Sequence, residues 1–414
     1  MNVLMLTPYV TISERPEFSK NKTGFGYMVF DIARAVAQTE NVDVLASDSR
    51  GKEFEIDKVR FLKRSFGLFL RNVFKCLSLK AVWKLKKQYT ISSSTLLRQI
   101  YYWFISGYYC NVIKDGNYDI VHIHGCGFAT DLWMQVCKKC DQKFVVTLHG
   151  LNSFSDTVRI EPAAKQYERD FLKRVVDREF PITVISTGMK RIIEKTYEVS
   201  DCNNITVVCN SFSFNGITPN MGGGKYLKIK QLYKIPENSQ IILYVGNVCR
   251  RKNQGQLIKA FELLKEDTAM NTYVLFLGGN IEPGYSIETL SQGSKYASHF
   301  ISCGVVDKEK VHYYYEQGDA VALMSLSEGF GLSLIEGLHF GLPCMSFTDV
   351  DAYDDIYNSL VMVGVDEHTD TSVAQGIEEL LGGDWDKEQI KKYSKKFESQ
   401  QMANNYVKVY QRTV

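Results

Sequence analysis

The sequence lacks the features that carry a chain into or across a membrane. No stretch reaches the ~18 apolar residues of a membrane span, and the longest candidate, residues 100–113, contains Ser106, Gly107 and Asn111. The first nine residues, MNVLMLTPY, lack the charged start and long apolar core of a secretory signal and are expected to form a buried strand. These absences predict a cytoplasmic protein.

Charge and cysteine content exclude two further classes. A formal net charge of +2 over 414 residues gives no general nucleic-acid-binding surface. The ten cysteines are scattered without the spacing of a disulfide framework, which favours a reducing compartment. No internal repeat or low-complexity tract is evident. The length is enough for two α/β domains with full cores.

Short apolar runs alternate with helical stretches in both halves of the chain. The expected strands cover residues 42–45, 120–123, 144–147, 182–185 and 205–208, and then 241–245, 273–277, 321–324 and 360–363. Such alternation predicts two Rossmann-like domains with parallel sheets and right-handed crossovers. The glycine-rich stretch 216–224 is the expected linker between domains at 1–215 and 225–395, and clefts between domains are favoured ligand sites.

One segment, EGFGLSLIE at residues 328–336, is the most informative in the chain. It follows an expected strand at 320–325, whose carboxyl end is where open α/β sheets bind ligands. A helix is expected from Gly331 to the stop at residues 341–343, with Leu334, Ile335 and Leu338 buried. The glycine-flanked turn and the helix N-terminus suit an anionic group. The carboxylates of Glu328 and Glu336 can accept hydrogen bonds from hydroxyls.

The longer block EGFGLSLIEGLHFGLP, residues 328–343, resembles the donor site of the retaining glycosyltransferases of family 4, which have the GT-B fold. The resemblance implies that Glu328 contacts the transferred sugar and that Glu336 contacts the ribose. It also implies donor binding by the residues of the turn, Gly329, Phe330, Gly331 and Leu332.

A second stretch, YVGNVCRRKN at residues 244–253, resembles the family turn whose arginine and lysine hold the donor diphosphate. Gly246 and Lys252 match that turn. Asn247 stands where many members have arginine, and either Arg250 or Arg251 is expected to supply the missing charge.

The first half of the chain carries weaker matches. The segment TLHG, residues 147–150, resembles the family segment whose histidine lies near the transferred sugar, so His149 is expected to contact the sugar or orient the acceptor. Gly24 and Gly26 fall where the family has its first glycine-rich loop. Asn210 and Ser211 resemble the family Asn-Gly after the last strand of the domain. In this family the last helix, expected here within 396–414, usually crosses back to the first domain.

The resemblance implies transfer of a hexosyl unit from a nucleotide-diphosphate sugar, UDP being the common nucleotide of the family, to a hydroxyl of a glycan or a lipid-linked acceptor. Negative charge on the departing phosphate would be stabilised by Lys252, an arginine and the helix N-terminus, with no metal and no cofactor. Glu328, His149 and Lys252 are the expected catalytic residues. Two alternatives stay open: a sugar-nucleotide epimerase with the same fold, and a sugar-nucleotide-binding subunit without catalysis.

The stretch from Lys58 to Lys114 contains twelve Lys or Arg and no acidic residue. Apolar and basic positions between residues 64 and 77 fall on different faces of a helix, and aromatic residues follow at 101–104 and at Tyr108 and Tyr109. This pattern favours contact with an anionic membrane surface or a lipid acceptor, on the inner face of the membrane. A solvated basic face over an ordinary core helix, and a charged funnel for a diphosphate lipid or an anionic glycan, are the other interpretations.

Three further signals are expected to be structural. His122 and His124 share one face of a strand, but no third metal ligand with suitable spacing is visible. Cys137 and Cys140 form a CxxC without a second pair. The Asp-Val-Asp at residues 349–351 imitates a metal-binding motif of another glycosyltransferase fold, and here it is interpreted as a loop variant.

Overall fold

The strands begin where the sequence has short apolar runs, and most strand residues are buried, as parallel sheets covered on both faces require. The computed structural model describes residues 1–18, 23–47, 52–63, 107–154, 161–177, 179–200, 202–212 and 228–414. The chain divides into an N-terminal unit, Met1–Asn210 with Ser399–Val414, and a C-terminal unit, Ser211–Glu398. The division falls before the predicted domain end at residue 215, and the predicted linker 216–224 lies outside the described residues.

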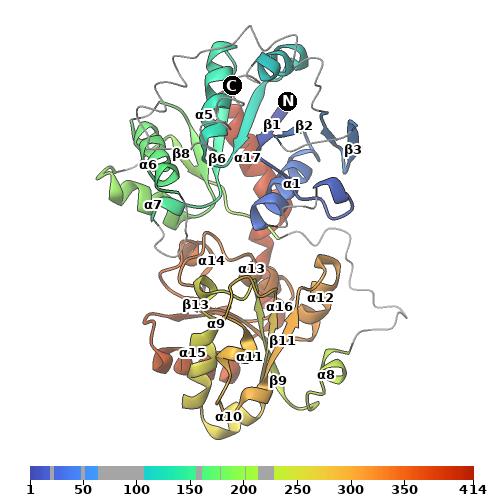
Figure 1. Ribbon diagram of the computed structural model, residues 1–414, viewed down its shortest axis with the longest axis vertical. Coiled ribbons are helices and arrows are strands. Elements are labelled where there is room, and N and C mark those ends of the chain that lie inside the picture. Colours follow the sequence, from blue (N-terminus) through green and yellow to red (C-terminus); the bar gives the residue numbers. More distant parts are fainter. Residues whose placement is uncertain are drawn as a thin grey trace. The chain divides into compact units, whose positions relative to one another are not determined.

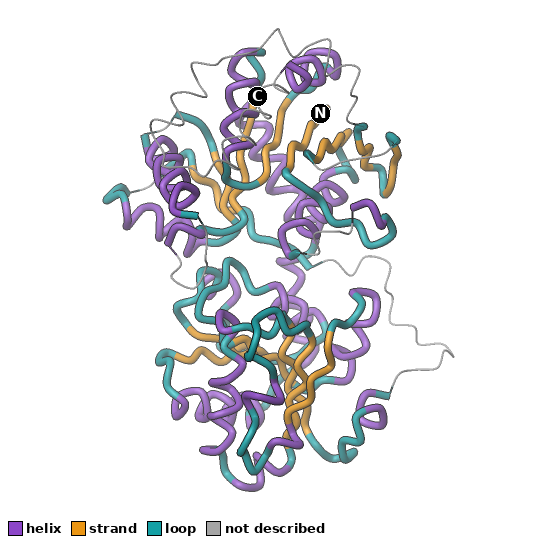
Figure 2. The backbone as a smooth tube through the Cα atoms, in the orientation of Figure 1, coloured by secondary structure: helices purple, strands orange, loops and turns teal. Residues whose placement is uncertain are grey.

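The N-terminal unit contains one eight-stranded sheet in the order β3-β4-β2-β1-β5-β6-β7-β8. Its strands are β1 (Asn2–Thr7), β2 (Asn41–Ala46), β3 (Phe54–Ile56), β4 (Val59–Phe61), β5 (Ile120–His124), β6 (Phe144–Leu148), β7 (Ile182–Val184) and β8 (Ile205–Val207). All neighbours are parallel except β3 and β4. Figure 2 shows these strands gathered in a single layer among helices.

The β3–β4 hairpin is absent from the sequence-based prediction. Its two-residue turn is Asp57-Lys58, and both residues have positive φ, +50° and +65°. Such a turn matches the twist of a hairpin, but Asn-Gly or Asp-Gly is its usual sequence signal. The three-residue strands and the unusual turn pair explain why the pattern predicted no hairpin here.

Helices cover this sheet, and one of them comes from the far end of the chain. They are α1 (Gly24–Val36), a helix over residues 107–116, α5 (Phe128–Lys139), α6 (Pro162–Val176), α7 (Thr187–Thr196) and α17 (Ser399–Thr413). The last helix, α17, packs beside α1 (Figure 1). Its Tyr406 and Tyr410 are fully buried, with their rings 5.1 and 5.6 Å from that of His122 in β5. The C-terminal residues therefore complete the core of the N-terminal unit.

The C-terminal unit contains a six-stranded sheet, parallel throughout, in the order β11-β10-β9-β12-β13-β14. Its strands are β9 (Gln240–Val245), β10 (Thr272–Leu277), β11 (Phe300–Gly304), β12 (Ala320–Leu323), β13 (Cys344–Phe347) and β14 (Met362–Val365). Its helices are α8 (Ile229–Leu232), α9 (Gln254–Ala260), α10 (Glu266–Met270), α11 (Ile287–Leu290), α12 (Lys308–Gln317), α13 (Leu332–His339), α14 (Tyr353–Ile356), α15 (Asp370–Gly382) and α16 (Lys387–Ser394). The predicted fold class, two parallel-sheet α/β domains, is confirmed.

The basic stretch 58–114 does not form one separate insert. Its first residues belong to the β3–β4 hairpin, and its last belong to the helix over 107–116. Tyr108 and Tyr109 are buried, 4% and 0% exposed, so the prediction that they face a membrane is wrong. Residues 64–106 lie outside the described residues. Within the described part of the chain, every helix is too short or too polar to span a bilayer.

Candidate active site

Each sheet has one point where the strand order reverses direction, and open α/β sheets bind ligands beyond the carboxyl ends of the strands at that point. In the N-terminal unit the reversal lies between β1 and β5, and in the C-terminal unit it lies between β9 and β12. The loops that follow these four strands contain most of the residues singled out in the sequence. Topology therefore places two candidate ligand sites, one in each unit.

In the C-terminal unit, Arg251, Lys252 and Glu328 form a charged cluster. The Lys252 ammonium contacts Oε2 of Glu328, and Arg251 Nη1 lies 3.4 Å from the same oxygen. Arg251 also donates to the carbonyl of Ser327 at 2.7 Å, and the Ser325 hydroxyl lies 3.4 Å from Oε2 of Glu328. The loop after β9 thus supplies two cations, and the loop after β12 supplies the carboxylate that holds them.

Backbone contacts fix these two loops against each other. The buried Tyr244 hydroxyl donates to the carbonyl of Lys252 and accepts the Met324 N–H at 2.9 Å. The Leu326 N–H donates to the Arg251 carbonyl at 2.9 Å. Gly246 has φ of +149°, and a Cβ there would lie 3.2 Å from Lys252 Cε. Glycine thus lets the lysine stem fold back over its own loop.

The pKa values of Glu328, a member of this cluster, and of the nearby Asp351 are shifted in opposite directions. Burial alone would raise the pKa of Glu328, but Lys252 and Arg251 outweigh burial and hold that pKa below its ordinary value. Burial and the negative charges of Glu328 and Asp349 raise the pKa of Asp351 to about 7. The Asp351 N–H donates to the Glu328 carbonyl at 3.3 Å, so the two residues are neighbours. The motif interpreted as a loop variant therefore borders the charged cluster.

The predicted helix is present as α13, with Gly331 as its N-cap and with Leu334, Ile335 and Leu338 buried. Its first turn leaves backbone N–H groups without helical partners, and the helix dipole adds partial positive charge there. Leu332 is its first residue. Phe330 is 3% exposed and packs against Phe397, so its side chain serves the core. Only its backbone, like that of Gly329, remains available for a donor.

Glu336 lies one helical segment further along the chain, within α13. It accepts a hydrogen bond from the buried Tyr315 hydroxyl of α12 at 2.8 Å. Two cations therefore hold Glu328, whereas a neutral phenol holds Glu336. The two signature acids thus have different environments, as expected if they contact different parts of one donor.

The structure distinguishes the two candidate arginines. Arg250 is 74% exposed, forms an ion pair with Glu282 at 3.6 Å and lies over the ring of Tyr285. Arg251 instead points to Glu328. Asn247 is exposed, and its carbonyl accepts from Gln254 at 3.0 Å. Arg251 therefore provides the second positive charge beside Lys252, and the Asn247 side chain takes no described part in the cluster.

In the N-terminal unit, a cavity of about 350 Å³ lies beyond β1, β5 and β6. His149 is partly exposed on its wall, and its ring lies 4.9 Å from Phe25, which in turn lies 5.1 Å from Tyr9. Its other lining residues are Pro8, Gly125, Cys126, Gly127, Ala129, Thr130, Gly150 and Asn152. The described wall thus combines aromatic rings, small residues and one imidazole, without any lysine, arginine or acidic side chain.

Behind this cavity lie the buried His122 and His124, which form a histidine cluster with the partly exposed His149. His124 Nδ1 lies 3.2 Å from His149 Nε2, and the centres of the His122 and His124 rings lie 4.0 Å apart, with the ring planes tilted by 35°. Both nitrogens of His122 are engaged, by the hydroxyls of Tyr410 and Thr147. The described residues contain no group of three side chains suited to a metal ion. Cys137 in α5 and Cys140, the C-cap of that helix, are free thiols.

The prediction of a glycine-rich loop at Gly24 and Gly26 is wrong, because α1 begins at Gly24. Thr23 is its N-cap, and the Thr23 hydroxyl accepts the Gly26 N–H at 3.3 Å. A Cβ on Gly26 would lie 2.2 Å from Thr11 Oγ1, so this glycine serves close packing. Phe25, between them, is the residue that reaches the cavity.

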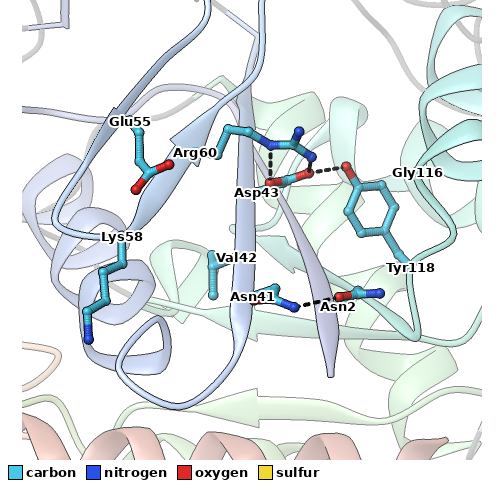
Figure 3. Close-up of a pocket in the computed structure, with 9 residues that line it drawn as sticks. All are labelled: Asn2, Asn41, Val42, Asp43, Glu55, Lys58, Arg60, Gly116 and Tyr118. Atoms are coloured by element: carbon cyan, nitrogen blue, oxygen red, sulfur yellow. Dashed lines mark hydrogen bonds and ion pairs between the residues drawn. The ribbon is translucent and has the colours of Figure 1, made fainter.

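A second cavity in the N-terminal unit, of about 340 Å³, opens at the other ends of β1 and β2 (Figure 3). Two of its charged groups are paired: Asp43 accepts from Arg60 Nε at 2.8 Å and also from the Tyr118 hydroxyl. Burial raises the pKa of Tyr118, as does its bond to Asp43. Because Asp43 is held in this way, we regard the cavity as part of the sheet edge and not as a site for the donor.

Comparisons with known proteins agree with this geometry. The model of the glycosyltransferase family 4 domain matches residues 23–213, and the model of the glycosyl transferases group 1 domain matches residues 226–397. The alpha-monoglucosyldiacylglycerol synthase of Acholeplasma laidlawii is 22% identical over 59% of this chain. The chain spans 61% of the length of that relative.

Solved structures resemble the whole chain. A glycosyltransferase from Rickettsia africae has a TM-score of 0.69 at 16% identity, covering 100% of this chain and 98% of its own. HepE from Anabaena, crystallised with UDP and glucose, has a TM-score of 0.65 at 14% identity, covering 100% of both chains. Because a glycosyltransferase model matches each half and GT-B proteins are its structural neighbours, the chain is a glycosyltransferase with the GT-B fold.

Proposed function

We propose that the protein transfers a hexosyl unit, with retention of anomeric configuration, from a UDP-sugar to a hydroxyl of a lipid-linked or glycan acceptor. The observation that carries this proposal is the charged cluster at the strand-order reversal of the C-terminal unit. Two cations and a helix N-terminus there can hold a diphosphate, and a carboxylate beside them can hold a sugar.

The chemistry requires stabilisation of the leaving group. When the bond between the anomeric carbon and the phosphate oxygen breaks, its electron pair stays on the β-phosphate. Lys252 and Arg251 are fixed by Glu328, Ser327 and the Tyr244 contact before any ligand arrives. Preorganised cations of this kind stabilise developing charge without reorganising during the reaction. We therefore propose that protein side chains fill the role that a metal ion has in other transferases.

The two acids are assigned to different parts of the donor. Glu328 is ionised and shielded, so it can accept hydrogen bonds from the sugar hydroxyls and stabilise positive charge at the anomeric carbon. Glu336, whose carboxylate accepts the Tyr315 hydroxyl, is assigned to the ribose hydroxyls. In the N-terminal unit, the aromatic and imidazole wall around His149 is assigned to the neutral, hydroxyl-bearing ligand.

The relatives support this assignment. The alpha-monoglucosyldiacylglycerol synthase carries a lipid acceptor in its name, and the HepE crystals contain UDP and glucose. WaaG from lipopolysaccharide biosynthesis is also a structural neighbour, with a TM-score of 0.59. A role in surface-glycan synthesis fits these names. The same names favour neither epimerisation nor binding without catalysis.

Binding of nucleotide sugars to the purified chain tests the donor assignment. A ligand that binds only the folded state adds about 2.7 kcal/mol of stability at a concentration of 100 Kd. We expect UDP-glucose, UDP-galactose or UDP-N-acetylglucosamine to raise the melting temperature, and GDP-mannose to raise it less. Lys252→Ala should remove the shift, and Arg250→Ala should keep it. Equal shifts in both variants would contradict the diphosphate assignment.

Turnover is tested separately. Slow hydrolysis of the bound donor releases UDP, and proton NMR of the sugar before mutarotation shows its configuration. We expect the α-anomer from an α-linked donor, and we expect the same rate after treatment with EDTA. A β-anomer would overturn retention, whereas loss of the rate with EDTA and its return with manganese would overturn the metal-free mechanism.

The basic stretch between residues 64 and 106, with eight Lys or Arg and no acidic residue, supports a further part of this proposal, contact with an anionic membrane surface. Sedimentation with vesicles that contain 30 mol% phosphatidylglycerol should remove the protein from solution at low salt, and vesicles of phosphatidylcholine alone should not. Equal behaviour with both vesicle types would count against it.

A further inference from the structure

We propose that His124 is a positioning residue that donates its Nδ1–H to His149 and thereby forces the His149 proton onto Nδ1. His149 then faces the cavity of the N-terminal unit as a hydrogen-bond donor toward a sugar oxygen, and not as a general base. This inference deepens the proposed function and rests on it for the identity of the ligand. The arrangement of protons, however, is a property of the ligand-free protein.

The first step is the number of protons between the two rings. His124 Nδ1 and His149 Nε2 lie 3.2 Å apart, so one of them donates and the other accepts. Burial lowers the pKa of His149 to about 3 and holds that of His124 well below its ordinary value. Both imidazoles are therefore neutral at pH 7, and each carries one proton.

The second step is the choice between two tautomers. If His149 donated from Nε2, the proton of His124 would lie on its own Nε2. That nitrogen is buried and has no hydrogen-bond partner in the described part of the chain. Buried N–H groups without partners are rarer in proteins than buried acceptors without partners. The pair is therefore more stable with the proton on His124 Nδ1, which leaves a bare lone pair in the core.

The third step is the consequence for His149. Its Nε2 is occupied as an acceptor, and a neutral ring has only one proton, so Nδ1 carries it. His149 follows β6, is partly exposed and lines the cavity with Phe25 and Tyr9. A protonated Nδ1 can donate to a hydroxyl oxygen, but it has no lone pair with which to remove a proton. The ring thus orients a sugar through one fixed hydrogen bond.

The rest of the cluster holds His124 in place. The His122 ring packs against the His124 ring, and its own nitrogens are engaged by Tyr410 and Thr147. His122 therefore contributes packing and leaves the tautomer of His149 unaffected. This difference between two adjacent buried histidines supplies a matched control.

The experiment reads the tautomer directly. The chain has seven histidines, so long-range ¹H–¹⁵N spectra of protein labelled with ¹⁵N-histidine resolve each ring, and His149→Phe assigns the signal. We expect the Nδ1–H tautomer for His149 in the wild type, in His122→Phe and in His124→Asn, whose amide can donate. His124→Phe should shift His149 toward a mixture. An Nε2–H tautomer in the wild type, or no change in His124→Phe, would overturn the inference.

A kinetic cycle tests whether His124 acts through His149. On the nucleotide sugar that gives the largest thermal shift, His124→Phe should lower kcat/KM by about tenfold, the effect of losing roughly one well-placed hydrogen bond. The double variant with His149→Phe should be no slower than His149→Phe alone. Additive losses would overturn the positioning role. The expected tautomer without any donor turnover would leave this inference standing and would instead remove the proposed function.

Discussion

The two units present opposite chemistry at the same topological position. Beyond β1 and β5 of the N-terminal unit, the cavity is lined by aromatic rings, glycines and the neutral His149. Beyond β9 and β12 of the C-terminal unit lie Arg251, Lys252 and Glu328. Both loops follow parallel strands that end at a reversal of strand order. The same backbone geometry thus holds a neutral surface in one unit and a charged cluster in the other.

Under the proposed function, each of these two chemistries suits a different ligand. A diphosphate requires fixed cations, because it brings negative charge into a site sheltered from water. A sugar hydroxyl instead requires directed hydrogen bonds and ring surfaces, which cost little to desolvate. A chain that handles both ligands can separate these demands by placing them on two sheets. The predictions below test this division, in order of expected size.

The largest expected effect is loss of the Lys252 ammonium. Lys252→Ala should lower kcat by about 10²–10³-fold, as removal of one preorganised electrostatic group does in other enzymes. The melting temperature should fall far less than activity, because Arg251 still neutralises Glu328. A variant that keeps kcat within a few-fold of the wild type would place the diphosphate elsewhere. Turnover by UDP release and thermal melting make the two measurements.

The next effect is the loss of stability when a glycine near each of the two candidate ligand sites is replaced by alanine. A Cβ on Gly278 would lie 2.1 Å from the carbonyl oxygen of Gly246, whereas one on Gly26 would meet the side chain of Thr11. Backbone cannot rotate away as a hydroxyl can, so we expect Gly278→Ala to cost about 3 kcal/mol and Gly26→Ala about 1–2 kcal/mol. Urea unfolding measures both. The control is Gly24→Ala, which has no atom within 4 Å and should be close to neutral. Equal losses in the free energy of unfolding for all three variants would contradict this account of the packing.

Sequence patterns could predict the elements of the fold where apolar runs are long. The strands β9 and β10 and the helix after Gly331 match their predicted segments to within two residues. The strands β3, β4, β11 and β13 were not predicted, because a charged residue or a serine interrupts each of their short apolar runs and their pairing is decided by neighbours in space. Sequence alone also placed Tyr108 and Tyr109 on a surface, although they are buried, since burial depends on tertiary packing.

Some residues of the candidate site could likewise be predicted from the sequence, and others could not. Glu328, Lys252 and His149 could be found because each follows a strand within a recognisable motif. The choice between Arg250 and Arg251 could not, because one residue of spacing does not say which side chain turns inward. Tyr244 and His124 could not be assigned roles either, since their contacts join segments 80 and 25 residues apart along the chain. Only the folded structure brings such partners together.

A smaller effect is the destabilisation of the C-terminal unit by ionisation of the Asp351 carboxyl. The pKa of Asp351 is about 7 in the folded state against an ordinary value of 3.8, so the folded chain binds more protons than the unfolded chain between these values. Stability therefore falls as pH rises through that window. The Asp351→Asn side chain carries no charge. The free energy of unfolding of this variant, relative to that of the wild type, should therefore increase by about 2 kcal/mol from pH 5 to pH 8. Asp384→Asn, at an exposed carboxyl, should show no such trend. A flat difference for Asp351→Asn in urea unfolding would remove the electrostatic argument.

The smallest effect distinguishes two adjacent arginines and so defines the edge of the charged cluster. Arg251 contacts Glu328 and the Ser327 carbonyl, whereas Arg250 pairs with Glu282 in solvent. Arg251→Ala should lower kcat/KM for the donor by about tenfold, since Lys252 remains and one charge-assisted contact is worth roughly 1.5 kcal/mol. Arg250→Ala should stay within about twofold, because exposed ion pairs contribute little. Both variants replace an arginine with alanine at neighbouring positions. A difference in their activity therefore comes from where each arginine side chain points, and not from the loss of a positive charge in general. The reverse order, with Arg250→Ala the slower enzyme, would mean that the diphosphate binds on the Glu282 side of the loop.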